Sequence, residues 1–174
     1  MTTFNVIEVM DETNRTEDVV SIKYSAGRID DASLVKLTDL VAGERDLYTA
    51  IAPTDVTKDE VVILAPADVY QMDNGMRIPI TDPTMIDYPA NRPLRAYRLP
   101  HGKRFKVSNT SITGTPVQGQ FVVPVNGSVG MAIATDLTGA TKIAFAVEET
   151  GSTCNIFVGA SAVPATILRV VTSV

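Results

Sequence analysis

The sequence predicts a mainly β fold: an antiparallel β-sandwich or barrel-like domain with an extended N-terminal arm and little helix. Three observations support this fold class. Valine, isoleucine and threonine make up about a third of the 174 residues, whereas leucine is sparse, and this balance favours pleated sheets. Ten prolines and eleven glycines interrupt the chain at short intervals. No segment between them keeps a helical apolar stripe over several turns.

Short runs rich in β-forming residues, separated by turn residues, predict strands in the pattern of a sandwich or barrel. In chain order they cover residues 3–9, 18–24, 34–40, 46–51, 60–65, 94–99, 104–108, 120–125, 128–135, 142–149, 154–158 and 165–172. Residues 30–40 also have a helical alternative, because Leu34, Leu37 and Val41 fall near helical spacing behind an acidic start. Asn126-Gly127 lies between two of the predicted strands and predicts a tight hairpin turn, since both residues tolerate positive φ.

We predict that residues 1–30 form an N-terminal arm of edge strands and that residues 31–174 form a single β domain. A chain of this length can bury a core without disulfides or metals. We expect the arm to pack against a neighbouring subunit or against the sheet edge of its own subunit.

Charge is distributed unevenly along the chain. Residues 1–87 carry seventeen acidic and seven basic side chains, whereas residues 88–174 carry three acidic and eight basic ones. The sign changes within a proline-bearing segment, which predicts a loop over residues 82–93 between an acidic part and a basic or neutral half over residues 94–174.

The start of the basic half is the candidate site for protein interaction. Its cationic residues are Arg92, Arg95, Arg98, Lys103, Arg104 and Lys106. Strand alternation and the turn-forming sequence Pro100-His101-Gly102 predict a hairpin here, with Tyr97 opposite Phe105 on the inner face and Arg98 opposite Arg104 on the outer face.

Two like charges directly opposite each other on a sheet are mildly destabilising, so an anionic neighbour would favour this arrangement. That neighbour is the acidic half of the same molecule, an identical subunit, another protein or a phosphate backbone; the alternative is a solvated cationic face. Nucleic acid is disfavoured among these, because the net charge is −5 and the aromatic side chains of the predicted hairpin point inward.

The sequence contains no pattern that indicates an enzyme, a cofactor or a metal site. His101 is the only histidine and lies in a predicted turn, and no nucleophile motif accompanies it. Cys154 is the only cysteine, which excludes an internal disulfide; we expect it to be a small buried apolar group. Asp73-Asn74-Gly75 predicts a turn without the acidic ladder of a calcium loop. No apolar run is long enough to span a bilayer and the start lacks a secretory signal, so we expect a protein made in the cytosol.

Four segments in order resemble the head decoration, or cement, proteins of tailed bacteriophages. They are GERDLYTAIAP at 43–53, RAYRLPHGKRFKVS at 95–108, GQFVVPVNGSVGMAIA at 119–134 and AFAVEETG at 144–151. The chain departs from that pattern at Lys103-Arg104, where an acidic residue is expected after the glycine.

The resemblance implies a mainly β protein without catalytic residues or cofactors, assembled in the host cytoplasm and located on the capsid surface of the virion. Its implied partners are the major capsid protein and other copies of itself, as a dimer or trimer. Two rival hypotheses are a tail or head-fibre structural protein and a carbohydrate- or receptor-binding β domain. A hydrolase using scattered carboxylates is disfavoured.

Overall fold

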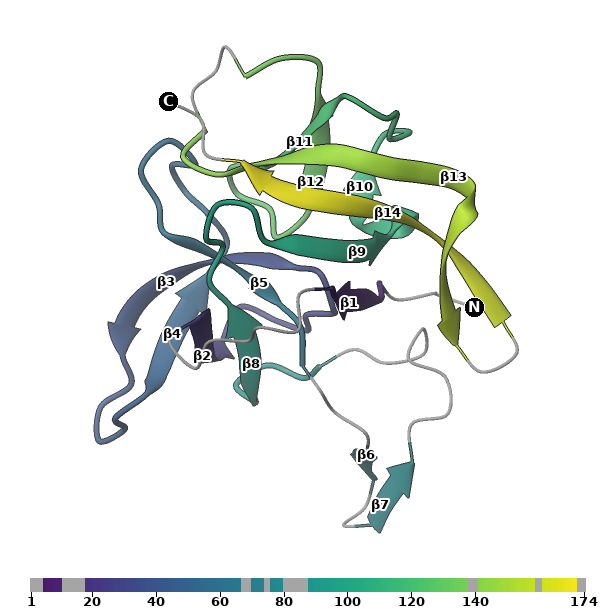
Figure 1. Cartoon of the computed structure of the whole chain (residues 1–174). Helices are drawn as coiled ribbons and strands as arrows, with labels where there is room; N and C mark the ends of the chain where they lie inside the picture. Colours follow the sequence, from purple (N-terminus) through teal and green to yellow (C-terminus); the bar gives the residue numbers. More distant parts are fainter. Residues whose placement is uncertain are drawn as a thin grey trace.

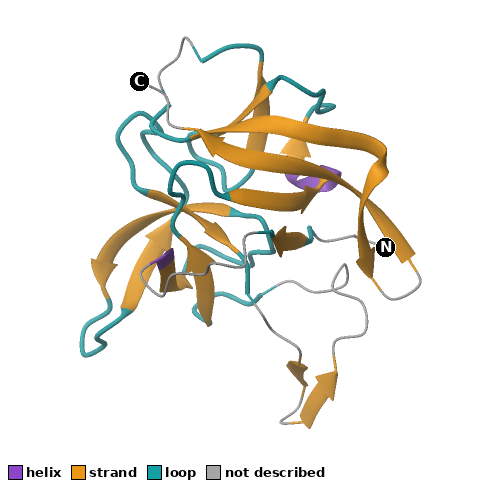
Figure 2. Cartoon of the chain, viewed as in Figure 1, coloured by secondary structure: helices purple, strands orange, loops and turns teal. Residues whose placement is uncertain are grey.

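The computed structural model describes residues 5–10, 18–66, 70–73, 76–79, 88–137, 141–158 and 161–171. The protein is mainly β, with 53% strand and two principal sheets, and no α-helix occurs among the described residues. Figure 2 shows strands dominating both parts of the molecule. The predicted mainly β fold class is therefore confirmed.

One sheet is a small closed barrel. Its strands, in spatial order, are β2 (Val19–Tyr24), β4 (Leu47–Ile51), β3 (Leu34–Leu40), β5 (Val61–Leu64) and β8 (Pro93–Tyr97). The β2–β4 pair is parallel and the other pairs are antiparallel. Alternate apolar residues, including Ile22, Val35 and Ala50, fill the interior and are fully buried. The helical alternative for residues 30–40 is wrong, because β3 pairs with strands on both of its sides.

The other sheet has seven strands. Their spatial order is β1 (Ile7–Val9), β9 (Arg104–Ser108), β14 (Ser161–Val171), β13 (Ala144–Val158), β11 (Phe121–Pro124), β12 (Met131–Ala134) and β10 (Ile112–Thr113). The 3-10 turn η3 (Asn109–Ser111) joins β9 to β10. The two strands predicted over 142–149 and 154–158 are one irregular strand, because β13 continues through shifts of register between Val147 and Asn155.

The barrel and the seven-stranded sheet share one hydrophobic core. Ile63 and Tyr97 of the barrel are buried in the same cluster as Phe105, Phe145 and Leu168 of the sheet. Figure 1 shows the sheet packed above the barrel. The two sheets therefore form a single packed body.

The predicted hairpin over residues 94–108 is wrong. β8 pairs with β2 and β5 in the barrel, whereas β9 pairs with β14 and β1 in the larger sheet. The turn itself is present, since the Lys103 amide donates to the Pro100 carbonyl at 3.2 Å and Gly102 has a φ of +88°. It carries the chain from one sheet to the other, so Tyr97 and Phe105 meet in the core but not as neighbours on paired strands.

The hairpin predicted around Asn126-Gly127 is confirmed as the antiparallel pair β11–β12, although its connection is longer than a two-residue turn. The pairing closes with Pro124 opposite Met131. Asn126 Oδ1 accepts a hydrogen bond from the Val56 amide at 2.9 Å, and the Gly127 amide donates to the Pro53 carbonyl at 2.7 Å. The longer connection thus docks onto the loop that follows β4.

The N-terminal arm contributes to both sheets. β1 pairs with β9 at the edge of the seven-stranded sheet, in the same chain, and β2 belongs to the barrel. Residues 1–4 and 11–17 lie outside the described residues. Of the two surroundings expected for the arm, β1 has the sheet edge of its own subunit, whereas β2 lies between β4 and β8 in the barrel.

A separate hairpin, β6 (Tyr70–Asp73) and β7 (Met76–Pro79), was not predicted. It closes with Asp73 opposite Met76, at the predicted turn, whose residues Asn74 and Gly75 lie outside the described part of the chain. The predicted loop over residues 82–93 is described only from Tyr88 onward, where Tyr88 forms a bridge with Ile29 before β8 begins.

Candidate interaction surface

Within the described part of the chain, at least four of the six predicted interaction residues form ion pairs inside the molecule. Their acidic partners come from distant parts of the chain. The pairs are Arg98 with Glu60, Lys103 with Asp18, Arg104 with Glu148, and Lys106 with Glu8. Three of these four carboxylates belong to the acidic residues 1–87, so folding neutralises much of the charge separation that the sequence shows.

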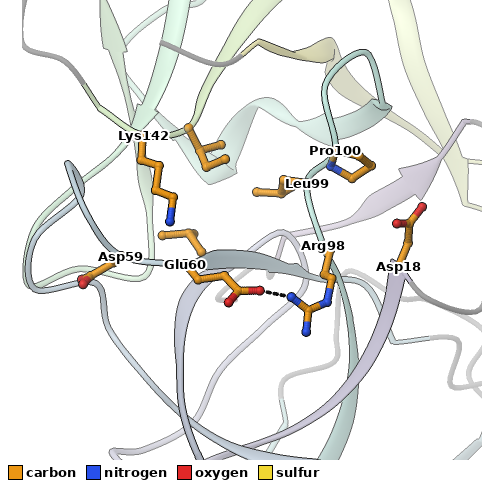
Figure 3. A pocket seen from close by; sticks show the side chains of 9 residues that line it. Asp18, Asp59, Glu60, Arg98, Leu99, Pro100 and Lys142 are labelled. Carbon is orange, nitrogen blue, oxygen red and sulfur yellow. Dashed lines mark hydrogen bonds and ion pairs between the residues drawn. The ribbon is translucent and has the colours of Figure 1, made fainter. Parts of the chain in front are cut away.

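Arg98 lies at the junction between the two sheets. It directly follows β8 and its guanidinium forms a hydrogen-bonded ion pair with Glu60 at the start of β5. Figure 3 shows this pair beside a pocket of about 270 Å³, with Lys142 extending from the opposite wall. The Lys142 ammonium donates to the Lys58 carbonyl at 3.3 Å. Side chains of both charge signs therefore line the pocket. Its walls are formed by residues of the barrel and by residues that precede β13.

Lys103 is buried, with only 6% of its surface exposed. Its ammonium lies 3.5 Å from Asp18 Oδ2 and 4.9 Å from the centre of the Tyr97 ring. A buried ammonium needs such partners, because its transfer from water to the protein interior costs free energy unless the charge is paired. Lys103 therefore has a local structural role: its acidic partner, Asp18, lies just before β2.

Glu148 bridges two arginines on neighbouring strands. Its two carboxylate oxygens lie 2.7 Å from Arg104 Nε on β9 and 2.6 Å from Arg169 Nε on β14. Because β14 lies between β9 and β13, this cluster ties three adjacent strands together on one face. Arg104 is directly opposite Arg169 in the sheet, and the shared carboxylate offsets the repulsion between them.

Arg92 and Arg95 lie against tyrosine rings. The Arg92 guanidinium is 5.6 Å from the centre of the Tyr88 ring and that of Arg95 is 6.0 Å from the Tyr97 ring. Arg95 also donates a hydrogen bond to the Tyr97 hydroxyl at 3.3 Å. The six cations do not form one patch, since they are divided between the barrel, the crossover turn and β9.

A second charged cluster, which the sequence analysis missed, surrounds Asp59. This buried carboxylate accepts hydrogen bonds from the amides of Thr54 and Asp55, both at 2.8 Å, and pairs with the Lys36 ammonium at 2.8 Å. Burial opposes its ionisation, but the Asp55 amide, Lys36 and the Thr54 amide together hold the pKa of Asp59 well below its ordinary value. The cluster fixes the turn between β4 and β5 at the rim of the pocket.

The only histidine and the only cysteine, the remaining residues considered for catalysis, do not form part of a charged cluster in the described contacts. His101 is exposed in the crossover turn. Cys154 is buried among apolar side chains, as predicted, and burial raises the pKa of its thiol. Within the described ranges, no group of three His, Cys, Asp or Glu side chains is placed to hold a metal ion, and no helix has the length and apolar character needed to cross a membrane.

The structure also shows a projecting hairpin that the sequence analysis missed. It consists of the distal parts of β13 and β14, which run past the end of β9 (Figure 1). Phe157, near its tip, is 77% exposed. The sequence signal for this hairpin is the absence of charge from residue 150 to residue 168, which is weak because residues 107–135 share it.

Comparisons with known proteins give no relative for this chain: no protein-family model, no curated protein and no solved structure matches it.

Proposed function

We propose that this protein is a virion structural protein that binds the outside of an assembled bacteriophage capsid and stabilises the shell, as head decoration proteins do. Four sequence segments that resemble those proteins suggest this function. The structural observation that carries it is the presence of exposed apolar side chains at strand ends on opposite sides of one packed β body. A protein so built can contact more than one neighbour at a time.

Two positions carry this observation. Leu40, at the end of β3, is 48% exposed, and Phe157, near the end of β13, is 77% exposed. Figure 1 shows the β3–β4 hairpin and the β13–β14 hairpin reaching outward on opposite sides of the molecule. Single exposed leucines are common, but a phenylalanine this exposed on a projecting hairpin resembles the aromatic anchors of protein interfaces.

The proposed mechanism is stabilisation by mass action. A ligand that binds the assembled shell and not the free subunits shifts the equilibrium towards the shell. Each contact can be weak, because a capsid presents the same site many times and contacts to several neighbours act together. The shared core and the ion pairs at the junction suit this role, since a rigid body loses little conformational freedom on binding.

The proposed partners are the major capsid protein and other copies of this chain, met on the capsid surface after synthesis in the host cytoplasm. In this proposal the six cations have two roles. Those that pair within the molecule hold neighbouring strands and the turn between β8 and β9 in place, and the exposed surface of the cations other than the buried Lys103 contributes to docking. The relative weight of the two roles is measurable by exchanging charges within a pair.

Mixing the purified protein with undecorated capsids and sedimenting the shells tests the proposal. We expect the protein to co-sediment in a fixed ratio to capsid subunits and to raise the temperature at which the shells open. Protein that stays in the supernatant at saturating concentration would contradict the proposal. Rings or tubes formed without capsids would instead support a tail protein.

A further inference from the structure

We infer that the pocket between the barrel and the seven-stranded sheet binds a small organic monocarboxylate, that is, one carboxylate group attached to a short apolar body. The pocket has a volume of about 270 Å³, just below the range of about 300–1,000 Å³ that suits drug-sized ligands. The proposed function does not require this ligand, and the test uses no capsids, so either idea can fail alone.

The charges that line the pocket leave one cation over. Among the described residues, three carboxylates and two cations lie in its walls. Each carboxylate has a cationic partner, and the pairs are Asp18 with Lys103, Asp59 with Lys36, and Glu60 with Arg98. The other lining cation is Lys142, whose ammonium contacts the Lys58 carbonyl at 3.3 Å and, in the described part of the chain, no carboxylate. The pocket therefore favours one negative charge.

Lys142 is positioned before any ligand binds. Its backbone amide donates to the Val56 carbonyl at 2.8 Å, and its ammonium donates to the Lys58 carbonyl. Figure 3 shows its side chain extending toward the side of the pocket that Glu60 occupies. An ammonium has three N–H donors, so one contact to a carbonyl leaves donors for a ligand oxygen. Because both ends of the residue are held, binding costs little of its conformational freedom.

Apolar side chains beside these charges favour an organic anion over an inorganic one. Val61, Leu99, Pro100 and Ile143 line the same pocket, and Val61 and Leu99 are buried parts of the barrel and the residues that follow it. A small apolar body that packs against them leaves water, which favours binding by about fourfold for each methyl or methylene group covered.

Glu60 limits the ligand to a single carboxylate. It is partly exposed and holds the Arg98 guanidinium in an ion pair, so the charge of Arg98 is already balanced. A second carboxylate on the ligand would lie close to Glu60 or to Asp18 in the same small pocket, and like charges at that distance repel each other. The geometry thus selects a monocarboxylate over a dicarboxylate.

Titration of the isotope-labelled full chain with sodium isobutyrate, followed by the NMR shifts of its backbone amides at constant ionic strength, tests the inference. We expect saturable shifts around Leu99 and Lys142 with a dissociation constant of about 1–20 mM, because one ion pair and a few carbon atoms supply little binding free energy. Acetate should bind about tenfold more weakly, since it lacks two carbon atoms of the apolar body. Neutral isobutyramide and cationic isobutylamine should give no saturable shifts.

Lys142→Gln is the decisive variant, and Lys58→Gln is its matched control. Both replace an exposed lysine by a neutral side chain of similar polarity, but the Lys58 side chain pairs with Asp55 at 3.1 Å and lies outside the pocket lining. Lys142→Gln should weaken isobutyrate binding about fivefold or more, whereas Lys58→Gln should stay within about twofold of the parent, because screening weakens its effect at a distance.

Glu60→Gln should act in the opposite direction. It removes a negative charge from the pocket and releases Arg98 from its ion pair, so isobutyrate should bind about threefold more tightly or better. Shifts that stay linear up to about 100 mM isobutyrate would overturn the inference. Equal binding of isobutyramide, equal weakening by Lys58→Gln, or weaker binding to Glu60→Gln would overturn it as well.

The same carboxylate chemistry occurs in free small acids and at the end of a polypeptide chain. N-acetylvaline presents an isopropyl group and a carboxylate together with the preceding amide, so it represents a chain end. If isobutyrate binds and N-acetylvaline does not, the ligand is a free acid. If N-acetylvaline binds at least as tightly, the pocket accepts a chain end, and both results support a monocarboxylate site.

Discussion

At the scale of single residues, Asp59 links stability to pH. Its pKa is lower in the folded protein than in the unfolded chain, where an aspartate titrates at about 3.9. The folded state therefore gains stability from the ionised carboxylate at any pH above that value. The gain is lost as the pH falls below about 4, because the unfolded chain then takes up a proton that the folded chain resists.

Replacing Asp59 with asparagine should remove this contribution. The change keeps the shape but loses the charge that Lys36 and two backbone amides stabilise, so we expect a loss of about 1.5–3 kcal/mol at pH 7. The difference from the parent should shrink as the pH is lowered from 5 to about 2. Urea unfolding across that range measures it. Asp39→Asn, an exposed aspartate on β3, is the control and should change stability by less than about 0.5 kcal/mol.

Removing either partner of the buried Lys103–Asp18 ion pair should have unequal effects on stability. Asp18→Asn leaves an ammonium buried without its carboxylate, and should cost about 1.5–3 kcal/mol of unfolding free energy. Lys103→Met removes the buried charge itself and keeps an apolar stem of similar length over Tyr97, so it should cost clearly less. Denaturant unfolding of the two variants and the parent makes the comparison. An equal or larger loss for Lys103→Met would show that the ammonium contributes net stability.

At the scale of elements, the Arg98–Glu60 pair joins the end of β8 to the start of β5. Both side chains are partly exposed, so the pair should contribute only about 0.2–1 kcal/mol. Arg98→Glu places two carboxylates together and should lower stability by about that amount or somewhat more. The exchanged variant Arg98→Glu with Glu60→Arg should recover most of the loss, measured as a double-mutant cycle in urea.

The same exchanged variant separates the two roles proposed for Arg98, which are pairing with Glu60 inside the molecule and contact with a partner protein. If stability is restored and capsid binding is unchanged, Arg98 acts only inside the molecule. If stability is restored but binding falls, the positive charge at position 98 contacts the partner directly. Recovery of neither would mean that the surroundings of the pair, including Lys142 and Asp18 in the same pocket, matter more than the pair itself.

The sequence was sufficient to predict most strands, because alternation of apolar and polar residues is a local property. The predicted strand 34–40 and the predicted strand 104–108 coincide with β3 and β9. The hairpin over 94–108 failed for a nonlocal reason. Tyr97 and Phe105 both point into the core. That orientation is compatible with a paired hairpin and equally with two separate sheets that meet in one core. The order of the strands in the sheets decides between these two arrangements, and a local sequence pattern does not contain it.

The candidate site was predictable only in part. A cluster of cations was visible in the sequence, and one of the alternatives for its anionic neighbours, the acidic half of the same molecule, matches Glu60, Asp18 and Glu8. The partners themselves depend on which strands lie side by side. Phe157 was missed for a similar reason, since its exposure follows from β13 extending beyond the strands that would cover it.

At the scale of the whole molecule, the opposite charges of the two halves hold distant segments together. Glu8–Lys106 and Asp18–Lys103 connect the first strands to the crossover turn and β9. These contacts supplement the shared core and do not replace it. The partly exposed Glu8–Lys106 pair is weak and screened by salt, and the attraction in the buried Asp18–Lys103 pair is offset by the cost of removing both charges from water. Cohesion between barrel and sheet thus depends chiefly on buried apolar side chains.

The shared core predicts that barrel and sheet unfold in one cooperative transition. Four of the five tyrosines, Tyr24, Tyr48, Tyr88 and Tyr97, lie on or beside barrel strands. Cys154 is buried on β13 of the seven-stranded sheet, so tyrosine fluorescence reports chiefly on the barrel and thiol labelling on the sheet. The sequence contains no tryptophan to mask the tyrosine signal. In a urea titration the two probes should give the same midpoint and slope.

Phe105→Ala tests the cause of this cooperativity. Phe105 is fully buried in the cluster that both sheets share, so its loss should cost about 3–5 kcal/mol and shift both probes together. The control is Ile156→Val, a smaller change of about 0.5–1.5 kcal/mol in the separate cluster around Cys154. Labelling of Cys154 at a urea concentration where tyrosine fluorescence is still native would show instead that the sheet opens while the barrel stays folded. A rigid two-sheet body would then no longer support the proposed binding to capsids.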